Sequence, residues 1–272
     1  MKRQQIIILI LAVLSIAGLY SLPRVVVDND ENEGGVVIDT TNPDAAGVDH
    51  SAAIPAEALP LVEQWKSELI AGSLITDNEQ ALDSLMLVFQ SVNKYDSAAY
   101  YAGRYAEAYP ETEHWRKAGD AYYEAFKFAV DEVKTVQLVN QARSFYDKIL
   151  NAGVNDLEAR NNIAMMLVST SNPMQGVMML REILAEAPED ERALYNMGIL
   201  SIRSQQFERA VERFETLVGY HPNHLEGQFY LGVSYFETGQ LQKAKSQFEK
   251  VKQMDSDEMV QTAADEYLGR IE

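Results

Sequence analysis

The sequence predicts an all-α protein whose helices form a solenoid of helix–turn–helix repeats, preceded by one transmembrane helix and a disordered acidic linker. Three observations predict this architecture. From about residue 55 onward, apolar residues recur every three or four positions, which is typical of amphipathic helices. In the second half of the chain, similar residues return at a fixed period of 34. Hydrophobic residues make up 47% and charged residues 24% of the 272 positions, the composition of a folded globular protein.

The segment 6–22 is apolar and uncharged, and it follows Lys2 and Arg3 within residues 1–5. As a helix it would be roughly 25 Å long, at the short end of a membrane span. The alternative is a cleaved signal peptide, for which Ser15-Ile16-Ala17 is a loosely fitting cleavage site. We expect a retained signal anchor with residues 1–5 in the cytoplasm, because the positive charge precedes the apolar run.

Residues 23–54 are predicted to be a flexible acidic linker. Between Val25 and Ile54 the chain carries seven acidic residues and no Lys or Arg, and it includes Gly34-Gly35 and Asn42-Pro43. Segments of this composition bury too little apolar surface to fold. The linker therefore connects the anchor to the helical body.

The repeat is clearest between residues 157 and 256. A step of 34 carries Gly198 forward to Gly232 and back to Ala164. Small residues at these positions let the two helices of a unit approach closely, large apolar residues fill the space against the next unit, and proline ends the second helix. The residues expected to pack the repeats are Gly198, Ala210, Phe214, Pro222, Gly232, Ala244 and Phe248.

This pattern resembles the tetratricopeptide repeat, a helix–turn–helix unit of 34 residues. The resemblance implies a right-handed solenoid. It is strong over three units, and weaker over a degenerate region in which Trp115, Gly119 and Tyr122 fit a first helix. An insert near Phe126–Gln137 is expected to lengthen both helices of that unit by one to two turns. The predicted divisions are 55–156 (degenerate region), 157–190, 191–224 and 225–256 (three units) and 257–272 (capping helix).

No catalytic constellation is found in the sequence. The chain has no cysteine, which excludes disulfides and thiolate metal sites, and it carries a net charge of −18, which argues against nucleic-acid binding. The tightest histidine pair, His221 and His224, lies at a repeat junction, where a plain loop is favoured over a metal site. Phosphate-binding, dinucleotide and metalloprotease motifs are missing from the sequence. We expect neither enzymatic activity nor a cofactor.

In the family that the repeats resemble, the first helix of each unit lines a concave groove at positions 2, 5, 9, 12 and 13. The resemblance implies an apolar groove with charges of both signs, suited to a peptide or helix. The lysine, asparagine and arginine clamp by which some relatives hold a terminal carboxylate is missing. The groove residues expected to bind protein are Met165, Arg192, Tyr195, Ile199, Arg203, Phe229, Val233 and Phe236.

Two alternatives to an open groove remain at this point. About half of these side chains could serve only to pack the units together. The helix near Leu61–Ile70, with Trp65 and Leu69, could also fold back into the groove.

The function expected from these features is a protein-interaction scaffold or chaperone-like adaptor without catalysis. It would be held in a bacterial inner membrane by a single span and would face the periplasm. The alternatives are an accessory or regulatory subunit of an envelope enzyme or secretion complex, and a self-assembling structural protein that forms homo-oligomers.

Overall fold

The computed structural model describes residues 53–70, 78–170 and 172–271, which belong to one compact unit. The predicted cytoplasmic N-terminus (1–5), the predicted anchor (6–22) and nearly all of the predicted linker (23–54) lie outside these residues. Within the described ranges, no helix has the length and apolar character needed to cross a membrane.

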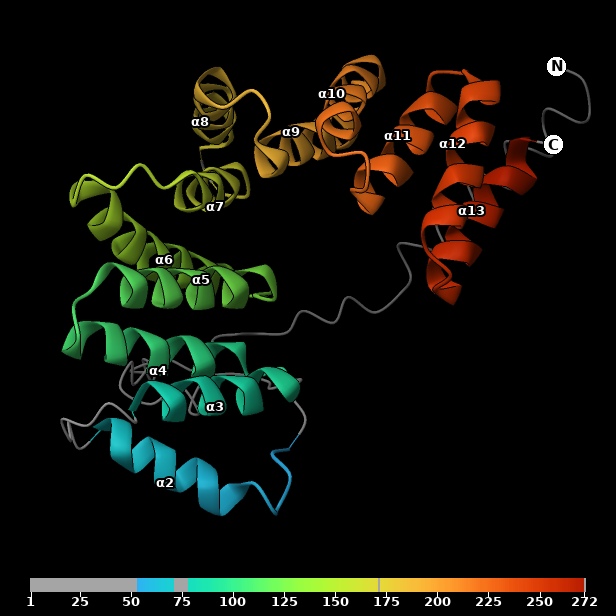
Figure 1. Cartoon of the computed structure of the whole chain (residues 1–272). Coiled ribbons are helices and arrows are strands. Elements are labelled where there is room, and N and C mark those ends of the chain that lie inside the picture. The colour runs from blue at the N-terminus through green and yellow to red at the C-terminus, as the bar shows by residue number, and fades with distance from the viewer. Residues whose placement is uncertain (1–52, 71–77, 171, 272) are drawn as a thin grey trace, which may run out of the picture. The chain divides into compact units, whose positions relative to one another are not determined.

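The described part of the chain is all-α and holds twelve helices, which follow one another from α2 to α13 (Figure 1). Five antiparallel pairs run from α3/α4 to α11/α12, with α2 before them and α13 after them. Their bounds are α2 Leu59–Ile70, α3 Asn78–Ser91, α4 Tyr95–Ala108, α5 Thr112–Lys127, α6 Glu132–Asn151, α7 Leu157–Val168, α8 Pro173–Glu186, α9 Glu191–Arg203, α10 Phe207–Tyr220, α11 Leu225–Glu237, α12 Leu241–Met254 and α13 Glu258–Ile271.

Side chains that cap the first turn explain where several helices begin. Asp156 and Asp190 accept hydrogen bonds from the backbone N–H groups of Ala159 (3.0 Å) and Ala193 (2.8 Å). His224 does the same for α11, with its Nδ1 3.1 Å from the N–H of Gly227. The histidine at the repeat junction therefore has a structural role in starting a helix.

Three of the turns inside helix pairs share one backbone conformation. The turns after α3, α9 and α11 each have three residues, and the middle one has a positive φ: Asn93 (62°), Gln205 (57°) and Gly239 (73°). This left-handed conformation is least costly for glycine, and asparagine tolerates it better than most other residues. A reversal this short holds each pair antiparallel and close.

Within a pair, the helices touch at the small residues of the repeat. A Cβ built on Gly198 would lie 2.5 Å from the Phe214 ring, and one on Gly232 would lie 2.9 Å from the Phe248 ring. Both rings and the alanines Ala210 and Ala244 are fully buried. The exception among the repeat-packing residues is Pro222, which is exposed in the turn before α11.

In the α7/α8 pair the usual order of glycine and alanine is exchanged, and the structure gives the reason. A Cβ on Gly176 would meet the backbone oxygen of Ala164 at 2.3 Å and the backbone nitrogen of Val168 at 2.9 Å. A backbone cannot move aside as an aromatic ring can. In this pair the helix that must lack a side chain at the contact is therefore the second, α8, and Gly176 supplies that position.

The insert near Phe126–Gln137 accounts for the longest helices. α5 has 16 residues and α6 has 20, whereas the first helices α7, α9 and α11 have 12 or 13 and their partners have 14. The gain is about one turn in α5 and nearly two in α6. Two valines in the middle of the insert are exposed, Val130 at 92% and Val133 at 59%.

The two terminal helices cover the ends of the stack. Val62 of α2 is buried, and Trp65 and Leu69 pack with it against the core of α3 and α4. The possibility that this helix occupies the groove of the later units is therefore wrong. At the other end, Ala264 of α13 is fully buried and Tyr267 lies on Phe248 with ring centroids 4.8 Å apart. Met259, near the start of α13, is 82% exposed.

The α7–α8 contact yields a stability prediction. Gly176→Ala should lower the free energy of unfolding by about 1–3 kcal/mol, the usual cost of overpacking, because the new methyl group meets fixed backbone atoms. Gly219→Ala in α10 is the matched control, since its Cβ meets nothing within 4 Å and alanine favours a helix by roughly 0.5–1 kcal/mol. Urea unfolding followed by circular dichroism measures both. Equal stability of the two variants would contradict the tight α7–α8 approach.

Candidate functional site

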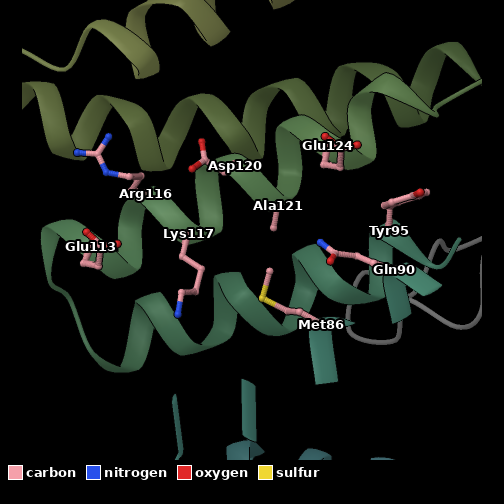
Figure 2. A pocket seen from close by; sticks show the side chains of 9 residues that line it. All are labelled: Met86, Gln90, Tyr95, Glu113, Arg116, Lys117, Asp120, Ala121 and Glu124. Carbon is pink, nitrogen blue, oxygen red and sulfur yellow. The ribbon is translucent and has the colours of Figure 1, made fainter. Parts of the chain in front are cut away.

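A cavity of about 590 Å³ lies between α3 and α5, next to the start of α4 (Figure 2). Met86 projects from α3 toward Ala121, and Lys117 reaches from α5 toward α3. The lining combines apolar, aromatic and charged side chains: Met86, Gln90, Tyr95, Glu113, Arg116, Lys117, Asp120, Ala121 and Glu124. We call it the α3–α5 cavity.

The repeat places these residues on the same face as the predicted groove. Counted from Thr112, the first residue of α5, positions 2, 5, 9 and 13 are Glu113, Arg116, Asp120 and Glu124. The groove residues predicted from the sequence come only from units 157–256, so these four residues are not among them. The signal was present in the sequence, since Trp115, Gly119 and Tyr122 already marked α5 as a first helix.

The two basic residues of the lining are engaged by carboxylates outside it. Lys117 donates to Glu79 and Asp83, with both Nζ–O distances at 2.8 Å. Arg116 pairs with Asp156, whose side chain is almost fully buried. Lys117 lowers the pKa of Glu79 through this hydrogen bond. These pairs fix both cations in place and tie α3, α5 and the start of α7 together.

Asp120 is the most enclosed carboxylate of the cavity. Its Oδ1 accepts a hydrogen bond from the Tyr146 hydroxyl (2.7 Å), and Asn162 Nδ2 lies 3.4 Å from the same oxygen. Desolvation by burial raises the pKa of Asp120, and the charge of Glu158 adds to this, while Tyr146, Arg116 and Arg192 oppose it. A carboxylate with a raised pKa in a cavity is a candidate functional group.

A second cavity of about 390 Å³ is lined by residues of α5, α7 and α9 together with the junction before α11. Glu124 of the first cavity and Lys127 of the second form an ion pair at 2.6 Å, so α5 is a wall of both. The lining of this α5–α9 cavity is Tyr123, Lys127, Asn162, Glu191, Arg192, Tyr195, Asn196 and His224.

Two of the eight predicted groove residues, Arg192 and Tyr195, line the α5–α9 cavity. Arg192 is exposed and pairs with Glu158 at 2.6 Å. Tyr195 is half-buried, and its ring stacks on His224 with centroids 5.2 Å apart. Burial raises the pKa of Tyr195 to about 12, so its hydroxyl is protonated at neutral pH and can donate a hydrogen bond.

The other six predicted groove residues lie outside the two cavities. Arg203 is exposed at the end of α9. Phe229 and Phe236 pack edge-to-face on Tyr267 of α13, at 5.9 and 5.5 Å between centroids. Met165 and Ile199 are half-buried in apolar clusters, and Val233 is 7% exposed. At the last unit, the predicted groove is thus occupied by the chain's own final helix, α13.

The described histidines and acidic residues do not form a metal site. Over the described ranges, no three His, Asp or Glu side chains are grouped so that they could hold an ion. His221 Nε2 lies 2.6 Å from the backbone oxygen of Glu189, which joins two successive junctions.

Comparisons with known proteins agree with the repeat pattern. Residues 195–258 match the family model described as tetratricopeptide repeat. A tetratricopeptide repeat protein of solved structure from Parabacteroides merdae is 16% identical and has a TM-score of 0.53, with 77% of each chain covered. Residues 195–258 thus match tetratricopeptide repeats, and the five described helix pairs show the same helix–turn–helix fold from α3 to α12.

Two further proteins are similar to this chain. The crystal structure of YrrB, described as a TPR protein with an unusual peptide-binding site, is 17% identical with a TM-score of 0.43, covering 79% of this chain and 100% of that chain. Protein O-mannosyl-transferase Tmtc3 of Drosophila melanogaster is 21% identical over 150 residues, which are 55% of this chain and 15% of that protein. This chain therefore spans only a small part of that relative's length.

The burial of Asp120 yields a pH-dependent prediction. Because its pKa is raised in the folded protein, the folded state holds the proton more tightly than the unfolded chain, and ionisation costs folding free energy above both pKa values. Asp120→Asn keeps an oxygen for Tyr146 and removes the charge, so it should raise the melting temperature at pH 7. The gain should shrink as the pH falls through the folded pKa of Asp120 toward about 4, where a free Asp titrates.

Glu249→Gln, at an exposed carboxylate of α12, is the control and should change the melting temperature little at either pH. A lower melting temperature for Asp120→Asn at pH 7 would show instead that the ionised carboxylate stabilises the fold.

Proposed function

We propose that this protein is a non-catalytic interaction scaffold that binds a segment of a partner protein along the first helices α3, α5, α7 and α9. The observation that carries this proposal is the pair of adjacent cavities with α5 as their common wall. Their linings combine apolar surface, aromatic rings and charges of both signs, as peptide-binding surfaces do. An extended segment crossing α5 would reach both.

The proposed binding surface does not include the last unit, 225–256, where the sequence had predicted part of the groove. Phe229 and Phe236 are covered by Tyr267, and Arg270 lies 4.5 Å from the centre of the Phe236 ring. Arg192 and Tyr195 remain accessible at the α5–α9 cavity, and they connect the predicted groove to the surface on α5. A partner that binds there contacts three successive first helices.

Photocrosslinking tests where a partner binds. A photoreactive amino acid at Glu113 or Arg192, one for each cavity, should give covalent adducts in cells, identified by mass spectrometry. The same amino acid at the exposed Glu212 of α10 should not, because it lies on a second helix. Adducts only at Glu212, or none at all, would contradict binding on the first helices.

The identity of the adduct decides between the scaffold and its alternatives. A translocon or envelope-assembly component favours the scaffold or adaptor. One envelope enzyme as the sole adduct favours an accessory or regulatory subunit, and adducts between copies of this chain favour self-assembly.

We further propose that segment 6–22 anchors the protein in a bacterial inner membrane and that the right-handed solenoid faces the periplasm. The support is the charge asymmetry of the sequence, with Lys2 and Arg3 before the apolar run and a strongly acidic stretch after it. The absence of cysteine suits an oxidising compartment.

Reporter fusions at Glu272 test this topology. A reporter that works only outside the cytoplasm should be active, and one that works only inside should be silent. A full-length species in the alkaline-washed membrane pellet is expected for a retained anchor. A soluble, shortened species would show that the segment is cleaved.

A further inference from the structure

We infer that the α3–α5 cavity receives a basic side chain, lysine or arginine, from the bound partner segment. This inference deepens the proposed function and rests on it. It names the chemistry of one contact rather than the partner itself.

The first argument is the balance of charge. Arg116 and Lys117 are already paired with carboxylates beyond the lining, and Lys127 forms an ion pair with Glu124. Around the cavity, these three cations face six carboxylates, so the site keeps an excess of negative charge. The six carboxylates are Glu79, Asp83, Glu113, Asp120, Glu124 and Asp156.

The second argument is the position of Asp120 and Glu124. They are four residues apart on α5, so their side chains are neighbours on one face of the helix, where like charges repel. Asp120 Oδ1 is engaged by Tyr146 and Asn162, which leaves Oδ2 to accept a hydrogen bond from a ligand. A bound cation would offset the repulsion and donate a charge-assisted hydrogen bond to Oδ2.

The third argument is the apolar part of the lining. Met86 of α3 and Ala121 of α5 point toward each other across the cavity (Figure 2). Lysine and arginine have aliphatic stems that pack on such surfaces while the charged end reaches a polar group. Tyr95 adds an aromatic ring, which is held in place by stacking on Phe128 at 4.2 Å between centroids. An acidic or small polar side chain would leave the apolar surface uncovered and bring no positive charge to Asp120.

Binding of charge-matched peptides tests the inference. The full-length protein in detergent is titrated with four pools of short peptides, with random flanking residues and a fixed central arginine, lysine, citrulline or glutamate. Citrulline has nearly the shape of arginine without its charge. The arginine and lysine pools should bind about tenfold or more tightly than the citrulline pool, as expected for one charge-assisted contact. The glutamate pool should bind most weakly.

Variants locate this preference in the cavity. Asp120→Asn and, independently, Glu124→Gln should each reduce the ratio of arginine to citrulline affinity. Glu249→Gln, far along the chain on α12, should leave the ratio as it is in the wild type. Glu124 is part of a partly exposed ion pair, so Glu124→Gln provides a second folded variant whose result does not depend on the Asp120–Tyr146 contact.

Three outcomes would overturn the inference: equal affinity for arginine and citrulline, an unchanged ratio in both cavity variants, or no binding of any pool. The photocrosslinking at Glu113 and Arg192 then distinguishes failure of the basic-side-chain contact from failure of the proposed function. Adducts at these positions without a preference for basic peptides refute the basic-side-chain contact alone, whereas the loss of both refutes the proposed function as well.

Discussion

The fold depends on the close approach of paired helices, and in the four described pairs from α5/α6 to α11/α12 this approach occurs where one helix has a glycine. At Gly198 and Gly232 the space of the missing Cβ is filled by a phenylalanine ring, and at Gly176 it is filled by the backbone of α7. Gly119 follows the same rule in the long pair, since its Cβ would lie 2.6 Å from the Tyr146 ring. That ring also brings a hydroxyl group to Asp120. The packing contact that joins α5 to α6 thus also positions a polar group of the α3–α5 cavity.

Polar contacts add a second level of organisation to this packing. Lys117 joins α5 to α3, Arg116 joins α5 to the capping residue of α7, and Arg192 joins α9 to α7. Successive first helices are thereby connected through charged side chains on their common face, while the second helices supply most of the large buried rings. Buried aromatic rings thus pack the two helices of a pair together, and charged side chains connect the first helices along their common face.

Much of the helical body could be predicted from the sequence, because the period of 34 records the packing directly. Glycine, alanine and phenylalanine recur where helices meet, and the first helices begin at the residues that the count requires. The site could be predicted only in part. Arg192 and Tyr195 of the predicted groove line a cavity, and their role in binding stays a prediction. Phe229 and Phe236 were expected to be open, and residue spacing does not reveal that Tyr267 packs against them. The α3–α5 cavity was missed because its unit is degenerate, although Trp115, Gly119 and Tyr122 fix its register.

The exchange of alanine and glycine between α7 and α8 has a consequence for how cooperatively the chain unfolds. In an array of helix pairs, each pair contacts mainly its neighbours, so global stability is approximately a sum of unit and interface terms, and opening spreads between adjacent units. The α7/α8 pair lies in the middle of the five and has the tightest backbone contact of those at glycine positions. It also lies between α5 and α9, whose side chains line the α5–α9 cavity. A ligand in that cavity adds an interface term across this pair and so makes the two halves of the array unfold more nearly as one.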